Sequence, residues 1–173
     1  MAKSGIMNAK DTVSGALAQC TVKIPYDLKT NKRLTDGKTC TYVLMQATKV
    51  EAKFDKNKVE VPILGKTGKG NKSVGWKGTG TATFHYNTTL FRRLLKLYAD
   101  TGEDIYFDMT IINEDKSTAV GKQTIVLVDC NLDGGIIAKF DAGTEVLDED
   151  ASFTFEDFRI GKDFTALEAF QFN

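Results

Sequence analysis

Apolar and polar residues alternate with a period of two in this chain, and that pattern constrains its fold more than any other feature. Residues 49–54 and 79–86 show it most clearly. Successive side chains of a β-strand point to opposite faces, so the alternation predicts half-buried strands with one packed and one polar face. The side chains expected on the packed faces are those of Val50, Ala52, Phe54, Ala82, Phe84 and Tyr86.

Further strands are expected where β-branched and aromatic residues cluster between turn residues. Pro25 should end the first strand, and Pro62 favours an edge position, because proline has no N–H to donate to a ladder. Residues 26–39 form a turn-rich excursion, and a turn or bulge is expected at 55–58. The expected extended segments are 20–24, 40–64, 75–86, 105–113, 122–131, 136–140 and 152–160.

One helix is expected among the strands. Asn87 or Thr88 should cap it, it should run to about Asp100, and Gly102 follows its end. A narrow apolar stripe at helical spacing must pack on a sheet, and here it consists of Phe91, Leu94, Leu95 and Tyr98. The sequence therefore predicts a mainly β fold of two packed antiparallel sheets, a β-sandwich or partly open barrel, with one flanking α-helix.

The 173 residues fit a single domain, which we expect to span residues 1–173. Its expected loose parts are a mobile N-terminal arm (1–17), a flexible hairpin loop (65–75) and a C-terminal tail (160–173). Basic and acidic residues both number 23, so no bulk charge draws the chain to nucleic acid or lipid.

The sequence also limits the cellular compartment in which the chain is expected to fold. No apolar run approaches the ~20 residues that span a bilayer, and the first residues lack the apolar stretch of a secretory signal. We therefore expect folding in a cytoplasm and no stable membrane association. Cys20, Cys40 and Cys130 are odd in number and widely spaced, so they are expected to be reduced, small apolar residues on strands.

Two segments resemble ligand-binding motifs, but the spacing of their residues does not match those motifs. Residues 65–73 resemble a phosphate-binding P-loop, but Asn71 stands where the lysine is required and no helix follows. Residues 129–134 copy the first half of an EF-hand loop, but Phe140 occupies the twelfth position, where a glutamate should close the coordination. A hairpin tip and a tight turn between strands are the favoured interpretations.

The remaining candidates for chemistry also have simple structural explanations. His85 is the only histidine, which excludes a histidine metal cluster, and it is expected to be a partly buried or interface side chain. Gly78 and Gly80 lie inside a strand and should admit close backbone approach or a bulge. Trp76 could stack on a sugar or base, but as a lone aromatic it is expected to anchor packing. We predict no enzyme, no cofactor and no metal.

Residues 63–86 are far more specific than these motifs. They read ILGKTGKGNKSVGWKGTGTATFHY and closely resemble the XkdM-like tail tube proteins of PBSX-type prophages. Further blocks that resemble this family follow in the same order, at 91–98, 104–108, 138–141 and 147–158. The resemblance covers about residues 48–158.

The resemblance implies a tail tube fold and a structural role. Subunits of this family close into hexameric rings, and the rings stack into a tube with a continuous inner β-barrel. The implied partners are other copies of the chain, a sheath protein, a tape-measure protein, a baseplate tube initiator and a tail terminator, with DNA only in transit if the particle is a phage. The implied location is a phage virion tail or a bacteriocin particle, assembled in the cytoplasm of a bacterial host.

Two other classes of function remain open from the residues alone. A monomeric β-sandwich module that binds carbohydrate or a surface would need an aromatic-lined cleft. A small enzyme would need a pocketed cluster of nucleophile, base and orienting group, and no such constellation can be assembled from this sequence.

Charge is segregated along the chain. Residues 49–77 carry eight lysines against three acidic residues, and residues 140–158 carry seven acidic residues and no basic one. One interpretation is two solvated faces without a shared role. The other is a self-assembly contact, in which the 65–75 loop docks on acidic residues of a neighbouring subunit. The residues of this hypothesis are Lys66, Lys69, Lys72, Trp76, Asp148, Glu149 and Asp150.

Overall fold

The computed structural model describes residues 9–166 of the chain. Most of this part is extended, as the alternating pattern predicts. In chain order its elements are η1 (Ala9–Asp11), η2 (Gly15–Leu17), β1 (Gln19–Ile24), β2 (Tyr26–Asp27), β3 (Lys32–Arg33), β4 (Cys40–Val43), β5 (Ala47–Val61), β6 (Gly70–His85), α1 (Leu90–Thr101), β7 (Phe107–Glu114), β8 (Lys122–Gly135), β9 (Asp148–Phe155) and β10 (Asp157–Lys162).

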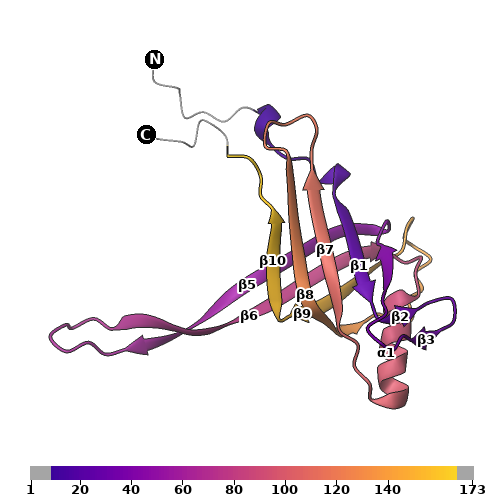
Figure 1. The fold of residues 1–173 in the computed structure, drawn as a ribbon, viewed down its shortest axis with the longest axis horizontal. Coiled ribbons are helices and arrows are strands. Elements are labelled where there is room, and N and C mark those ends of the chain that lie inside the picture. Colours follow the sequence, from indigo (N-terminus) through magenta and orange to yellow (C-terminus); the bar gives the residue numbers. More distant parts are fainter. Residues whose placement is uncertain (1–8, 167–173) are drawn as a thin grey trace.

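Eight strands form one antiparallel sheet in the order β4-β1-β7-β8-β9-β6-β5, with β10 beside β8, while β2 and β3 pair separately. The long strand β8 joins two layers because it changes partner along its length. Val128 pairs with Asp157 of β10, whereas Asn131 pairs with Thr154 of β9. The β5, β6 and β9 layer crosses behind the β1, β7, β8 and β10 layer (Figure 1). The two packed sheets predicted from the sequence are thus two parts of one continuous antiparallel sheet.

The change of partner lies next to Asp129, which has a positive φ of 51°. This backbone conformation is uncommon for a residue other than glycine, and irregular residues of this kind bend strands. The sequence prediction of a tight turn at 129–134 is therefore wrong, because β8 continues through this segment to Gly135.

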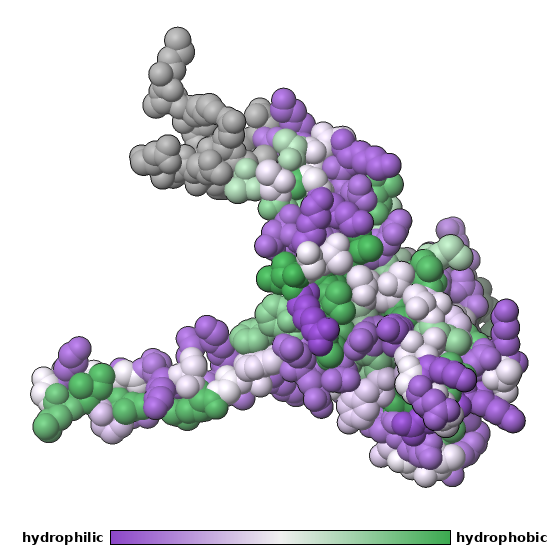
Figure 2. Space-filling view, viewed as in Figure 1, coloured by the Kyte–Doolittle hydropathy of each residue, from purple (hydrophilic) through white to green (hydrophobic). Residues whose placement is uncertain are grey.

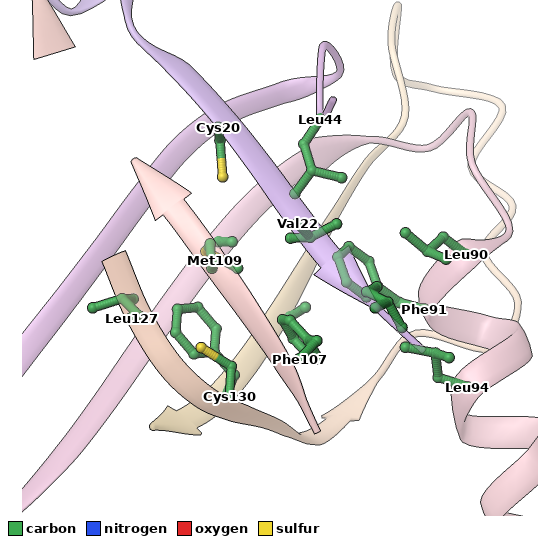
Figure 3. Close-up of a cluster of buried hydrophobic side chains, with 14 of the residues drawn as sticks. Cys20, Val22, Leu44, Leu90, Phe91, Leu94, Phe107, Met109, Leu127 and Cys130 are labelled. Carbon is green, nitrogen blue, oxygen red and sulfur yellow. The ribbon is translucent and has the colours of Figure 1, made fainter. Parts of the chain in front are cut away.

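The hydrophobic core lies between the two layers. Burial alternates along β6 and β9, so that Ala82 and Phe84 of β6 lie on the same buried face as Ala151 and Phe153 of β9. Figure 3 shows side chains of β1, β7, β8 and α1 that complete this cluster. They include Val22, Leu90, Phe91, Phe107, Met109 and Leu127. The buried residues of the core therefore come mainly from six of the strands (β1, β2, β6, β7, β8 and β9) and from the helix α1.

The three cysteines are free, as expected. Cys20 and Cys130 are buried within the core, and burial raises the pKa of each thiol to about 12. A thiol with so high a pKa stays protonated and unreactive at neutral pH, so both residues act as small apolar side chains.

The two glycines of the 78–80 segment have the role that the sequence predicts. Gly78 is paired with Phe155 and Gly80 with Phe153 on the neighbouring strand. A Cβ atom on either glycine would overlap the aromatic ring opposite it. Glycine is required here because the rings of β9 lie directly on the backbone of β6.

Helix α1 packs on the sheet through Phe91, whose ring lies 5.1 Å from that of Phe84 between centroids. It ends at Gly102, which has a positive φ of 71° and closes the last turn, as predicted. The start differs by one or two residues. Thr89 is the N-cap and makes no side-chain capping bond, whereas the hydroxyl of Thr88 accepts a hydrogen bond from the N–H of Leu90. Of the predicted stripe, Phe91 and Leu94 are buried, but Tyr98 is 54% exposed, and the buried Leu90 was missed.

Three further segments differ from the sequence prediction. Residues 136–140 are not a strand, because β8 already ends at Gly135. The single strand expected at 152–160 is two strands, separated at Glu156. There the pairing with β6 ends, and the pairing with β8 moves from residues 131–135 to residues 124–128. The loop expected at 65–75 is shorter, because β6 begins at Gly70 and pairs there with Val61.

Both ends of the described chain are held against the β7–β8 hairpin. Asp115 accepts a hydrogen bond from the backbone N–H of Ser14 at 2.9 Å and from Ser117, and these donors lower the pKa of Asp115. At the other end, the N–H of Thr165 donates to the carbonyl of Val120. Residues 9–17 therefore do not form a free arm. The predicted C-terminal tail begins within β10, which extends to Lys162, and Thr165 beyond it is bonded to Val120. Residues 1–8 and 167–173 of the two predicted segments lie outside the described residues.

Candidate functional site

The longest projection from the sheet is a two-stranded arm, residues 55–77. Strand β9 stops pairing with β6 at Gly78, and from Lys77 outwards β6 pairs with β5 alone. Both outer edges of the arm are therefore unpaired within the described chain. Figure 1 shows the arm extending well beyond the rest of the fold.

Trp76 packs at the root of the arm. Its ring stacks on that of Phe54 with 4.6 Å between centroids and meets Phe158 of β10 edge-on at 6.4 Å. Phe155 lies 6.2 Å away in a tilted arrangement. Contacts of this kind fix the direction in which the arm leaves the sheet. The side chain is thus a packing anchor, as the sequence predicts.

The packed face expected for β5 is only partly buried. Val50 is partly buried and packs against the core, but Ala52 is exposed and Phe54 is 43% exposed. The reason is topological, because β5 is the outermost strand of its layer and its outer half leaves the sheet. Alternation in sequence identified the two faces correctly but did not reveal what covers them.

The outer half of the arm has one apolar and one polar face. Cross-strand register places Val59 and Val61 on the same face as their partners Lys72 and Gly70. The side chain of Ile63 lies over Gly70. Exposed apolar side chains cover much of the arm out to its tip (Figure 2). They belong to Val59, Val61, Ile63, Leu64 and Val74.

The opposite face of the arm is polar. Its side chains include Lys58, Glu60 and their partners Ser73 and Asn71. The Nζ of Lys69 lies 2.8 Å from a carboxylate oxygen of Glu60, and both side chains are well exposed. The arm as a whole carries six lysines against two acidic residues. It is thus a basic ribbon with an apolar face.

The acidic residues predicted to receive the lysines lie at the opposite end of β6 from the arm. Asp148 lies 2.7 Å from Nδ1 of His85, and Asp150 accepts a hydrogen bond of 2.7 Å from the hydroxyl of Thr83. Both carboxylates lie on the outward face of the layer, because successive side chains of β9 alternate between the core and the solvent.

Glu149 points the other way and does not belong to this surface. It is buried, and its carboxylate bonds to the guanidinium of Arg92 on α1 at 2.5 Å. Burial raises the pKa of Glu149, and Arg92 opposes part of that rise. The guanidinium also lies over the ring of Tyr86 at 4.2 Å. We therefore correct the predicted set, because Glu149 holds the helix to the sheet and is not available to a partner.

Sequence reasoning missed the apolar component of this end of the molecule. Backbone N–H groups of His85 and Tyr86 bond to the carbonyls of Gln46 and Leu147, which gathers the β4–β5 turn and the 136–147 segment around the end of β6. We call this surface the acceptor end. Its exposed apolar residues are Met45, Ile137, Phe140 and Val146, and its exposed or half-exposed acidic residues are Asp141, Glu145, Asp148 and Asp150.

The sequence contains only a weak signal that these apolar residues are exposed. Ile137 and Phe140 lie in a segment predicted as a strand, where alternate apolar residues imply burial. The segment instead has no strand partner, so both side chains are more than half exposed.

No catalytic constellation emerges from the described residues. They contain no group of three or more histidine, cysteine or acidic side chains that could hold a metal ion. The P-loop-like segment forms the tip of the arm, and no described helix is long and apolar enough to cross a membrane. A groove of about 610 Å³ lies beside the edge strands β4 and β5, and it is lined mainly by small and aliphatic side chains.

Comparison with known proteins assigns a family. A family model described as "Phage tail tube protein" matches residues 5–161. Two proteins of Bacillus subtilis (strain 168), the phage-like element PBSX protein XkdM and the uncharacterized protein YqbM, are each 34% identical to this chain over 154 residues. The match covers 89% of this chain and 93% of each relative.

Solved structures show the same fold at low sequence identity. The tube terminating cap of the anti-feeding prophage aligns with a TM-score of 0.59 at 9% identity, over 92% of this chain and 98% of that one. The SPP1 tail tube aligns with a TM-score of 0.53 at 8% identity, over 94% and 87%. A chain of the PVC sheath–tube complex, from an extracellular contractile injection system, gives 0.52 at 10% identity, over 82% and 87%.

Proposed function

The chain belongs to the phage tail tube protein family, and from that membership we propose that it is the repeating subunit of an inner tail tube. Six copies form a ring, and the rings stack into a hollow tube inside a contractile sheath. The tube conducts DNA in a phage or punctures a target membrane in a phage-tail-like bacteriocin. Its other partners are the tape-measure protein, the baseplate tube initiator and the tail terminator, and assembly takes place in the host cytoplasm.

The observation that carries this proposal is the set of free strand edges. Among the described residues, β4 and β5 end the sheet, β10 pairs on one side only, and β5 alone offers an unpaired edge along 15 residues. Proteins that stay monomeric usually cover or shorten such edges. A ring uses them, because each subunit pairs with the next and closure leaves no edge free. The many lysines of β5 limit unspecific pairing before assembly.

We assign the polar face of the β5, β6 and β9 layer to the bore. It carries the hydroxyls of Thr79, Thr81 and Thr83, and the apolar faces of β6 and β9 are committed to the core. On β5, Glu51 bridges the lysines on either side of it at 3.1 and 2.9 Å. A lining of hydroxyls and neutralised charges suits a barrel whose inner face is solvated and whose outer face is packed against other parts of the protein.

We also retain the electrostatic contact in a corrected form. Lys66, Lys69 and Lys72 of one copy face Asp148 and Asp150 of another, and Glu149 takes no part. The internal Lys69–Glu60 pair does not prevent this, because exposed ion pairs contribute little and exchange readily. Complementary charge would set the register of the stack.

Charge reversal tests this contact. Changing Lys66, Lys69 and Lys72 to Glu should block stacking at low salt, where screening is weakest, and leave the fold intact. Lysines at Asp148 and Asp150 should restore part of the stacking. If the triple variant polymerises like wild type at low salt, the lysines only solvate the arm.

Assembly itself tests the proposed function. Purified protein should give rings or hollow tubes of uniform width in electron micrographs, at least in the presence of the baseplate initiator. A chain that stays monomeric at high concentration with its initiator would favour a monomeric binding module.

A further inference from the structure

We propose that Glu51 determines how the bore acts on nucleic acid. By cancelling the charge of Lys49 and Lys53 beside it, Glu51 allows DNA to pass along the polar face of β5, β6 and β9 without being retained. The inference rests on the proposed tube function and on the assignment of that face to the bore. It adds a residue that controls the electrostatic contact between the tube and its cargo.

Strand register fixes which side chains share the polar face with Glu51. Glu51 pairs with Thr81 of β6, and Thr81 pairs with Ser152 of β9, so the three form one row across the layer. The rows on either side each begin with a lysine of β5 and continue with a threonine of β6. These neighbouring rows are Lys49–Thr83–Asp150 and Lys53–Thr79–Thr154. The cations of the three rows are therefore two lysines with Glu51 between them.

Glu51 bonds to both lysines at once. The Nζ atoms of Lys49 and Lys53 lie 3.1 and 2.9 Å from its two carboxylate oxygens. Hydrogen bonds from Lys53 and Lys49 lower the pKa of Glu51, so the carboxylate is ionised at neutral pH. The two lysine side chains are 65% and 66% exposed. Without Glu51, both ammonium groups would be open to the phosphates of a passing DNA.

This cancellation does not require strong ion pairs. Exposed pairs exchange readily, but residues two positions apart on a strand are separated by only about 7 Å. That spacing is shorter than the Debye length of about 8 Å at physiological salt, so a phosphate responds to the summed charge of the rows. With Asp150, the three rows hold two lysines and two carboxylates. The next row pairs Asp55 with Lys77 and adds no net charge.

The effect of one carboxylate is multiplied by assembly. Every copy in a ring contributes the same rows, so a change of one charge per subunit recurs around the bore. Duplex DNA carries one negative charge per about 1.7 Å of its axis, and lysines that neutralise its phosphates bind it with a steep dependence on salt. Loss of Glu51 should therefore convert a lining that releases DNA into one that holds it.

Neutralisation of Glu51 tests the inference. Tubes of a Glu51→Gln variant should retain at least about tenfold more labelled DNA duplex than wild-type tubes at about 50 mM salt, and release it by about 200 mM. Co-sedimentation measures retention, and the retained DNA should resist a nuclease because it lies in the bore. Glu51→Gln/Lys53→Gln restores the wild-type charge and should retain no more DNA than wild type. Glu114→Gln, which removes the same charge from β7 in the other layer, is the matched control.

Three results overturn the inference and leave the tube function standing. They are equal retention by wild-type and Glu51→Gln tubes, equal retention by Glu114→Gln tubes, and retained DNA that a nuclease digests. If Glu51→Gln does not assemble, Asp55→Asn removes the carboxylate opposite Lys77 and should raise retention in the same way. Failure of the wild-type chain to form tubes would instead contradict the proposed function.

Discussion

Single residues explain how the aromatic rings of β9 fit against the neighbouring strand β6. Gly78 and Gly80 accept the rings of β9 on their backbone, which only glycine permits. The sequence predicts this role, because glycines inside an alternating strand favour close approach. The sequence could not predict the orientation of Glu149, because Asp148, Glu149 and Asp150 are alike in charge. Strand register turns the middle carboxylate inward to Arg92.

Substitution of Gly80 tests the close packing. Gly80→Ala places a methyl group against the ring of Phe153 and should destabilise the unassembled subunit by about 2 kcal/mol, since overpacked cores typically lose 1–3 kcal/mol. The melting temperature should then fall by roughly 4–8 °C. Gly134→Ala is the control, because nothing lies near its Cβ position. Equal melting temperatures for the two variants would contradict the packing described here.

At the scale of elements, the hairpin of β5 and β6 and the helix α1 follow from periodicity and capping residues. The limits of the strands follow less well. Residues 136–140 have the composition of a strand but find no partner in the described chain. Residues 152–160 divide at Glu156, where pairing with β6 ends and pairing shifts to another part of β8. Pairing partners come from tertiary topology, which local sequence does not encode. The exposure of Phe54 could not be predicted for the same reason. Its burial would require a further strand beside β5, and β5 is the last strand of its layer.

The arm depends on its aromatic root. Trp76→Ala removes the stack on Phe54 and the edge contact with Phe158, each of the kind that contributes about 1 kcal/mol. Amides of residues 55–77 should therefore exchange hydrogen several-fold faster, whereas core amides should change little. Tyr98→Ala, an exposed aromatic on α1, is the control. Unchanged exchange in the arm would show that the aromatic cluster does not fix its direction.

For the whole molecule, the free edges, the arm and the acceptor end are consistent with a subunit that completes its sheet and covers its apolar surfaces only in an assembly. The sequence predicts the class of fold and, through family resemblance, the tube. It did not identify the exposed apolar residues of the acceptor end, because apolar residues in a strand-like pattern predict burial in a core. Three-dimensional placement separates the two cases.

The most direct test is a cryo-electron microscopy reconstruction of the assembled chain at a resolution that separates strands. If the proposed function is correct, the reconstruction will show a hollow tube of six-membered rings. The polar face of β5, β6 and β9 should line the bore, and each arm should reach the next ring. A tube without six-fold rings, or one in which that polar face is turned away from the bore, would contradict the account.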